Sequence, residues 1–205
     1  MPNSVELLGH YGGDITHALS AWTSTQRDLT AEKVKRIPTL LKMLAENEHH
    51  TPFEKSAIHF LVRTDAATHI HLIKHRIGVS VNGESARYKE LKEDHYYIPN
   101  DWPEEMQDDL QFELSEIYRK YHNYVMTLEE RGYSRARAKE SARFILPYAN
   151  QTWADVMFNF RSFMHFQKLR NEEHAQKEVR DLAQSMLELV RATGDFEWSL
   201  KAFGW

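Results

Sequence analysis

Cysteine is absent from this sequence of 205 residues. Disulfides, thiolate zinc sites, iron–sulfur clusters and mechanisms that use a cysteine nucleophile are therefore excluded. Long apolar runs and a charged-then-apolar leader are also lacking, so we expect no membrane span and a cytoplasmic location. Positive charge is not in excess, because the formal net charge is -4. That balance argues against a general nucleic-acid binder.

The composition is that of an ordinary globular protein, with 41% hydrophobic and 27% charged residues. The length is enough to bury a hydrophobic core. We find no internal repeat, low-complexity tract or Gly/Ser linker. A single domain over residues 1–205 is therefore predicted.

Hydrophobic periodicity predicts an α+β fold that is rich in helix. Asp14 and Thr30 are predicted to cap the first two helices, and Pro38 predicts a kink or a late start in the second. Residues 74–88 lack a clean period and are interpreted largely as loop. The predicted strands cover residues 5–10, 56–63 and 152–160. The predicted helices cover residues 14–21, a segment after 30, 65–76, 103–131, 134–146, 162–169 and 175–193.

The densest polar cluster lies between residues 74 and 88. It combines cations with hydroxyl groups, which suits a phosphate, because Arg offers a planar fork of donors and Ser a single O–H. A solvated charged loop is the plainer interpretation of such a cluster. Its members are Lys74, His75, Arg76, Ser80, Asn82, Glu84, Ser85, Arg87 and Tyr88.

Two further patterns are ambiguous when taken alone. Arg161 and Arg170 flank an aromatic stretch, which suits a flat heterocycle or else a packed core with arginines reaching outward. His71 and His75 are one helical turn apart and could share a metal, but that spacing is common in a chain with 12 histidines, and no metal is predicted.

The order of these motifs resembles the flavin-dependent thymidylate synthases. The family signature is Arg-His-Arg, a seven-residue gap and Ser-x-Arg; here Lys74–Arg76 reads Lys-His-Arg, and eight residues separate it from Ser-Ala-Arg at 85–87. The other matching blocks are His-His-Thr-Pro-Phe-Glu at 49–54, Ala-Arg-Phe-Ile-Leu-Pro at 142–147, Asn-Phe-Arg-Ser at 159–162, Leu-Arg at 169–170 and His-Ala-Gln at 174–176.

The resemblance implies an α+β fold with a mixed or antiparallel sheet and a homotetramer whose active sites combine several subunits. It also implies a methyltransferase that converts dUMP into dTMP. FAD, reduced by NADPH, would supply the hydride equivalent, and methylenetetrahydrofolate the carbon. No enzyme nucleophile is needed, which agrees with the missing cysteine. The flavin-free route to thymidylate attacks the uracil ring with a cysteine thiolate.

Site residues follow from the resemblance position by position. Arg170 and Ser85 would be the catalytic residues, with Arg170 at the carbonyl edge of the pyrimidine. The FAD site would be lined by His49, Thr51, Glu54, Lys74, His75, Arg76, Asn159 and His165. The nucleotide would be bound by His71, Glu84, Ser85, Arg87, Arg143 and Arg170.

Several departures from the family pattern leave the nucleotide open. Lys74 replaces an Arg, His71 a Gln and His165 an Asn, and the longer gap lets Gly83 or Glu84 stand for the loop Glu. The same chemistry on UMP or dCMP is therefore an alternative to dUMP. A non-catalytic nucleotide-binding module and a metal-dependent hydrolase are more distant alternatives.

Overall fold

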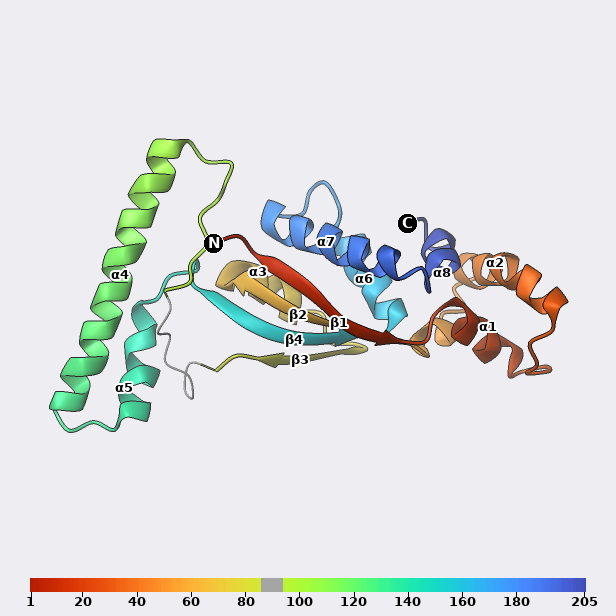
Figure 1. Ribbon diagram of the computed structural model, residues 1–205, viewed down its shortest axis with the longest axis horizontal. Coiled ribbons are helices and arrows are strands. Elements are labelled where there is room, and N and C mark those ends of the chain that lie inside the picture. The colour runs from red at the N-terminus through yellow and green to blue at the C-terminus, as the bar shows by residue number, and fades with distance from the viewer. Residues whose placement is uncertain (86–93) are drawn as a thin grey trace. The chain divides into compact units, whose positions relative to one another are not determined.

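The computed structural model describes residues 1–85 and 94–205. Four strands form one antiparallel sheet in the order β1-β2-β4-β3 (Figure 1). The strands are β1 (Ser4–Tyr11), β2 (Ala57–Asp65), β3 (Val79–Gly83) and β4 (Gln151–Phe158). The three predicted strands are confirmed.

β3 corrects the prediction that residues 74–88 are largely loop. Val79 and Val81 are half-buried while Ser80 and Asn82 are exposed, which is the alternation of a strand with one covered face. The strand has only five residues, follows Gly78 and ends at Gly83, so its alternation is too short to be recognised in the sequence.

Helices dominate the rest of the described chain, and the helix-rich α+β class is confirmed. Single 3-10 turns η1 (Thr51–Glu54) and η2 (Arg143–Ile145) accompany them. The α-helices are α1 (Asp14–Trp22), α2 (Ala31–Glu46), α3 (Ala66–Ile73), α4 (Glu104–Glu130), α5 (Arg135–Ala142), α6 (Phe160–Arg170), α7 (Lys177–Thr193) and α8 (Glu197–Ala202).

The predicted cap at Thr30 is confirmed, because its side chain accepts from the Lys33 amide at the start of α2. The late start predicted from Pro38 is wrong, since α2 begins at Ala31 and contains Pro38 in its interior. Asp14 does not cap α1, whose N-cap is Gly13.

The Asp14 carboxylate instead satisfies the first turn of α8. It accepts from the Trp198 amide at 2.8 Å and from the Ser199 amide at 2.7 Å. These are orphan donors of a helix N-terminus, which an acidic side chain stabilises. The side chain that predicted a cap for α1 therefore accepts from amides 184 and 185 residues away in the sequence.

The chain divides into two compact units, whose bounds fall inside the four strands and inside α3. The first comprises Met1–Ser4, Arg63–His71 and Asn82–Ala154; the second comprises Val5–Val62, Leu72–Val81 and Asp155–Trp205. In the first unit α4 packs against α5 around buried Tyr121, Val125 and Ala138. The single domain expected for residues 1–205 stays a prediction.

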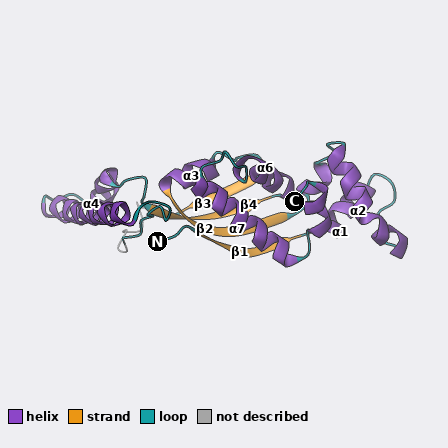
Figure 2. Cartoon of the chain, turned by 90° about the horizontal axis from the view of Figure 1, so that it is seen from above, coloured by secondary structure: helices purple, strands orange, loops and turns teal. Residues whose placement is uncertain are grey.

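In the second unit, helix α6 lies over the sheet (Figure 2), and aromatic side chains from both form a buried core. Phe163 of α6 lies 5.8 Å from both Phe60 of β2 and Phe158 of β4, measured between ring centroids. Helices α1, α2 and α8 pack on one another in the same unit. In the described part of the chain, no helix is long and apolar enough to cross a membrane.

Candidate functional site

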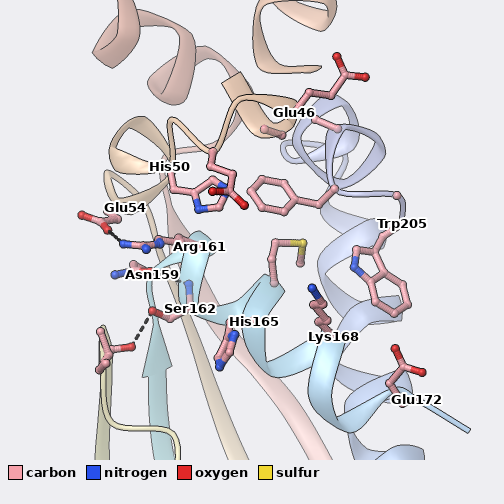
Figure 3. Close-up of a pocket in the computed structure, with 17 residues that line it drawn as sticks. Glu46, His50, Glu54, Asn159, Arg161, Ser162, His165, Lys168, Glu172 and Trp205 are labelled. Carbon is pink, nitrogen blue, oxygen red and sulfur yellow. Dashed lines mark hydrogen bonds and ion pairs between the residues drawn. The ribbon is translucent and has the colours of Figure 1, made fainter. Parts of the chain in front are cut away.

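A cavity of about 770 Å³ opens in the second unit along α6 (Figure 3). Its volume lies within the range of about 300–1,000 Å³ that is common for small-molecule sites. Glu54, Asn159 and His165, three of the predicted FAD residues, are among those that line it. The cavity is also lined by His50, Arg161, Ser162, Lys168, Phe203 and Trp205.

One edge of the cavity is held by an ion pair between η1 and α6. Arg161 Nη1 donates to Glu54 Oε1 at 2.5 Å (Figure 3). Both side chains are partly exposed, so the pair adds little to stability by itself. Its consequence is geometric, because it fixes a cation near the first turn of α6.

The first turn of α6 is closely packed against the turn before β3. Asn159 caps α6 by accepting from the Ser162 amide at 2.8 Å, and Ser162 Oγ donates to the Ile77 carbonyl at 2.6 Å. Gly78 has a φ of +65°, and a Cβ added there would overlap the Asn159 amide and the Ser162 hydroxyl. Glycine is therefore required at residue 78 by both conformation and space.

Next to this turn, a buried histidine contacts an arginine. Arg170 Nε donates to His75 Nε2 at 3.0 Å. Burial, with smaller contributions from the neighbouring Arg170 and His165, lowers the pKa of His75 to about 4. His75 is therefore neutral at pH 7. Because its Nε2 accepts a hydrogen bond, its own proton lies on Nδ1.

The pair of His75 and Arg170 joins one predicted flavin residue to one predicted nucleotide residue. The two residues are 95 positions apart; His75 lies two residues after the end of α3, and Arg170 lies in the last turn of α6. A guanidinium held by a neutral acceptor keeps its full positive charge. It is thus suited to stabilise negative charge that develops on a bound ring.

The remaining predicted FAD residues are not among those that line the cavity. His49, Thr51, Lys74 and Arg76 are all exposed. They adjoin residues that do line it, since His50 follows His49 and Ile77 follows Arg76. Their assignment to the flavin stays a prediction.

Most of the predicted nucleotide residues lie in the first unit. Glu84 is half-buried, and its Oε2 accepts from the Trp153 amide at 3.3 Å, which ties the residue after β3 to β4. His71, Ser85 and Arg143 are also half-buried, on α3, after β3 and in η2. Arg87 lies outside the described residues. Their role in nucleotide binding stays a prediction.

Several cavity residues were missed in the sequence. Lys168 follows His165 by three residues and so shares its helix face, a signal that could have been used. Phe203 and Trp205 belong to no recognised motif, and the sequence offers no signal that they reach this cavity. Within residues 1–85 and 94–205, no group of three or more His, Asp or Glu side chains could hold a metal ion.

Comparison with known proteins bears on the chemistry of this site. Residues 6–193 match the family model Thy1, described as thymidylate synthase complementing protein. A flavin-dependent thymidylate synthase from Pseudothermotoga lettingae is 31% identical over 206 residues, which covers 97% of this chain and 89% of that protein. Its counterpart from Thermosipho africanus is 29% identical over 211 residues, covering 97% and 90%.

Solved structures show the same fold. The crystal structure of the UMP/dUMP methylase PolB from Streptomyces cacaoi, bound with 5-Br dUMP, superimposes with a TM-score of 0.81 at 25% identity. The similarity covers 98% of this chain and 94% of that one. The blocks that suggested the family, the family match over residues 6–193 and the relatives agree. The chain therefore belongs to the flavin-dependent thymidylate synthase family.

Proposed function

We propose that the protein makes dTMP from dUMP by reductive methylation at C5, with FAD as cofactor and NADPH and methylenetetrahydrofolate as co-substrates. The observation that carries this proposal is the contact between Arg170 and neutral His75, which joins predicted flavin and nucleotide residues at 3.0 Å. The bound flavin supplies the hydride equivalent. The protein contributes binding, orientation and charge.

The cavity fits the chemistry of FAD. Its volume suits a large flat ligand, and Arg161 brings a cation to the first turn of α6. A helix N-terminus favours anions, and the Asn159 side-chain amide lies there. Asn159 and Arg161 would hold the diphosphate, and His165 would contact the cofactor farther along α6.

In the reaction, Arg170 would act on the pyrimidine. Its guanidinium would lie at the carbonyl edge of the base and stabilise negative charge as C5 becomes nucleophilic. His75 would hold that guanidinium in place through Nε2. Ser85, Arg87 and Arg143 would bind the phosphate, with His71 and Glu84 beside the nucleotide. Ser85 is the second residue predicted to be catalytic.

UMP is the second candidate substrate, because PolB is described as a UMP/dUMP methylase. The departures at His71 and in the gap before Ser85 fall on predicted nucleotide residues. The test uses nucleotides tritiated at C5 and counts the tritium released to water, which must leave whenever C5 gains a methyl group. The protein is incubated with FAD, NADPH and methylenetetrahydrofolate, and dUMP, UMP and dCMP are compared.

Release from dUMP that depends on FAD and NADPH is the expected result. A faster release of tritium from UMP or dCMP would identify that nucleotide, and not dUMP, as the substrate. Protein that retains no FAD and releases no tritium would instead favour a binding module without catalysis.

We also propose a homotetramer in the cytoplasm, in which Arg143 reaches the nucleotide of a neighbouring subunit. The family resemblance supports the assembly, and the bulk composition supports the location. Light scattering coupled to size exclusion tests the assembly. A mass of about one chain, 24.2 kDa, in a preparation that turns over would contradict it.

A further inference from the structure

One wall of the cavity along α6 is formed by residues to which neither the family motifs nor the proposed function gives a role. Ala202, Phe203, Gly204 and Trp205 line it at the end of α8. The family match ends at residue 193, and the last site residue implied by the resemblance is Arg170. In Figure 3, Trp205 lies on the side of the cavity away from Glu54, Asn159 and Arg161.

The backbone at Trp205 is fixed by the way α8 ends. Gly204 has a φ of +84°, its amide donates to the Lys201 carbonyl at 3.1 Å, and the Trp205 amide donates to the Leu200 carbonyl at 3.0 Å. This pair of bonds is the Schellman motif, which ends a helix with a left-handed residue. Trp205 is thus held at a defined position beside the cavity.

Phe203 and Trp205 differ in what their rings contact. The Phe203 ring packs edge-on against Phe53 at 4.9 Å and lies 5.5 Å from the ring of His50. Phe203 therefore anchors the end of α8 in the core. The half-buried Trp205 indole lines the cavity and has no aromatic ring partner in the described parts of the chain.

We propose that Trp205 is a cofactor-binding residue that contacts one of the flat ring systems of FAD. This rests on the proposed function. Indole is the largest aromatic side chain, and a ring-on-ring contact adds binding free energy beyond the area it buries. A pterin shares this chemistry, but Glu54, Asn159 and His165 in the same cavity are predicted flavin residues, so FAD is favoured.

The test titrates FAD into protein stripped of flavin, for the wild type and matched variants. Trp205→Ala is expected to raise the Kd for FAD about five- to tenfold, and Trp205→Phe about twofold. Trp198→Phe is the control, because Trp198 lies in α8, seven residues before Trp205, and lines a different cavity. Its Kd is expected to equal that of the wild type.

Tryptophan fluorescence gives a readout that does not depend on turnover. FAD is expected to quench part of the emission, and this part should vanish in Trp205→Phe and persist in Trp198→Phe. Gly204→Ala should also raise the Kd, since an L residue is strained at its φ. Gly132→Ala, at a φ of +87° with no atoms near its Cβ, imposes the same strain at the end of α4 and should leave the Kd unchanged.

The outcomes separate the two proposals. Wild-type protein that binds no FAD would overturn the proposed function and this inference with it. FAD binding of equal strength in the wild type and in Trp205→Ala, with quenching unchanged in Trp205→Phe, would overturn the inference alone. A raised KM for methylenetetrahydrofolate in Trp205→Ala, with the FAD Kd unchanged, would assign the wall to the pterin and overturn the flavin contact.

Discussion

Two histidines of the second unit, His17 and His75, are buried, and burial lowers the pKa of each to about 4. Their partners differ. His17 lies between two serine hydroxyls, with Nδ1 2.8 Å from Ser199 Oγ and Nε2 2.9 Å from Ser56 Oγ. His75 accepts from the guanidinium of Arg170.

The hydrogen-bond network around His17 is made entirely by groups of the fold, and the imidazole at its centre is neutral at pH 7. Ser199 Oγ donates to Asp14 at 2.5 Å, so it accepts from His17 Nδ1, and Ser56 then donates to Nε2. Both serines are buried, and so every hydrogen-bonding group of the ring is used within the fold. At His75 a full positive charge is held beside predicted ligand residues. A shifted pKa therefore marks burial in both places, and the partner indicates which one serves chemistry.

The largest expected effect is a loss of turnover when the positive charge beside His75 is removed. Arg170→Ala removes the proposed stabilisation of charge on the pyrimidine. Tritium release should fall by a factor of about 10²–10³ while the protein folds normally. Arg180→Ala is the control, because Arg180 is a half-buried arginine of α7 whose guanidinium donates to the Glu173 carbonyl. An Arg170→Ala protein with unchanged turnover would remove Arg170 from the site.

At His17 the expected effect is on stability. His17→Phe keeps an aromatic ring near Phe53 and Phe160 but leaves two buried serines short of a partner. The free energy of unfolding should fall by about 2 kcal/mol in urea denaturation. His10→Phe is the control, since it keeps a ring beside Phe196 and loses only the contact of exposed His10 with Asp195 at the surface, and it should change stability by less than about 1 kcal/mol. Equal losses in the two variants would contradict the role of the network.

Stability should also fall as the pH drops from about 6.5 towards 4. An unfolded histidine takes a proton near pH 6.5, whereas buried His17 and His75 take one only near pH 4. The unfolded state therefore binds more protons in this window, and the free energy of unfolding decreases as pH decreases. Burial raises the pKa of Asp14, which acts in the opposite direction at the acid end.

Denaturation at pH 5 and pH 7 measures this slope. The slope should be smaller in His17→Phe than in the wild type, because one of the histidines whose pKa is lowered by burial is gone. An identical slope in the two proteins would show that His17 does not titrate as its burial implies.

Local sequence signals predicted the elements that depend on neighbours in the chain. Thr30 caps α2 through the amide three residues on, and this cap was predicted from sequence. Asp14 has the same local signal, but its carboxylate is used by α8, which the sequence did not predict. Propensity cannot reveal a partner that only tertiary folding brings near.

The site shows the same limit. Ordered motifs selected Glu54, Asn159 and His165, which share one cavity. The contact between His75 and Arg170 joins residues 95 positions apart, so their pairing needed the structure. No sequence pattern indicated that Trp205 lines the site, because a single aromatic residue after a short helix is common in protein sequences. Its place in the cavity follows from how α8 ends.

The most direct test compares two variants in two assays. His75→Phe and His17→Phe are each measured for tritium release from dUMP and for unfolding in urea. The two variants are expected to give opposite results in the two assays. His75→Phe should lose at least about tenfold in rate, because Arg170 loses its acceptor, with less than about 1 kcal/mol of stability. His17→Phe should keep its rate and lose about 2 kcal/mol. A His75→Phe protein that turns over like the wild type, or a His17→Phe protein that loses rate to the same extent, would contradict the account.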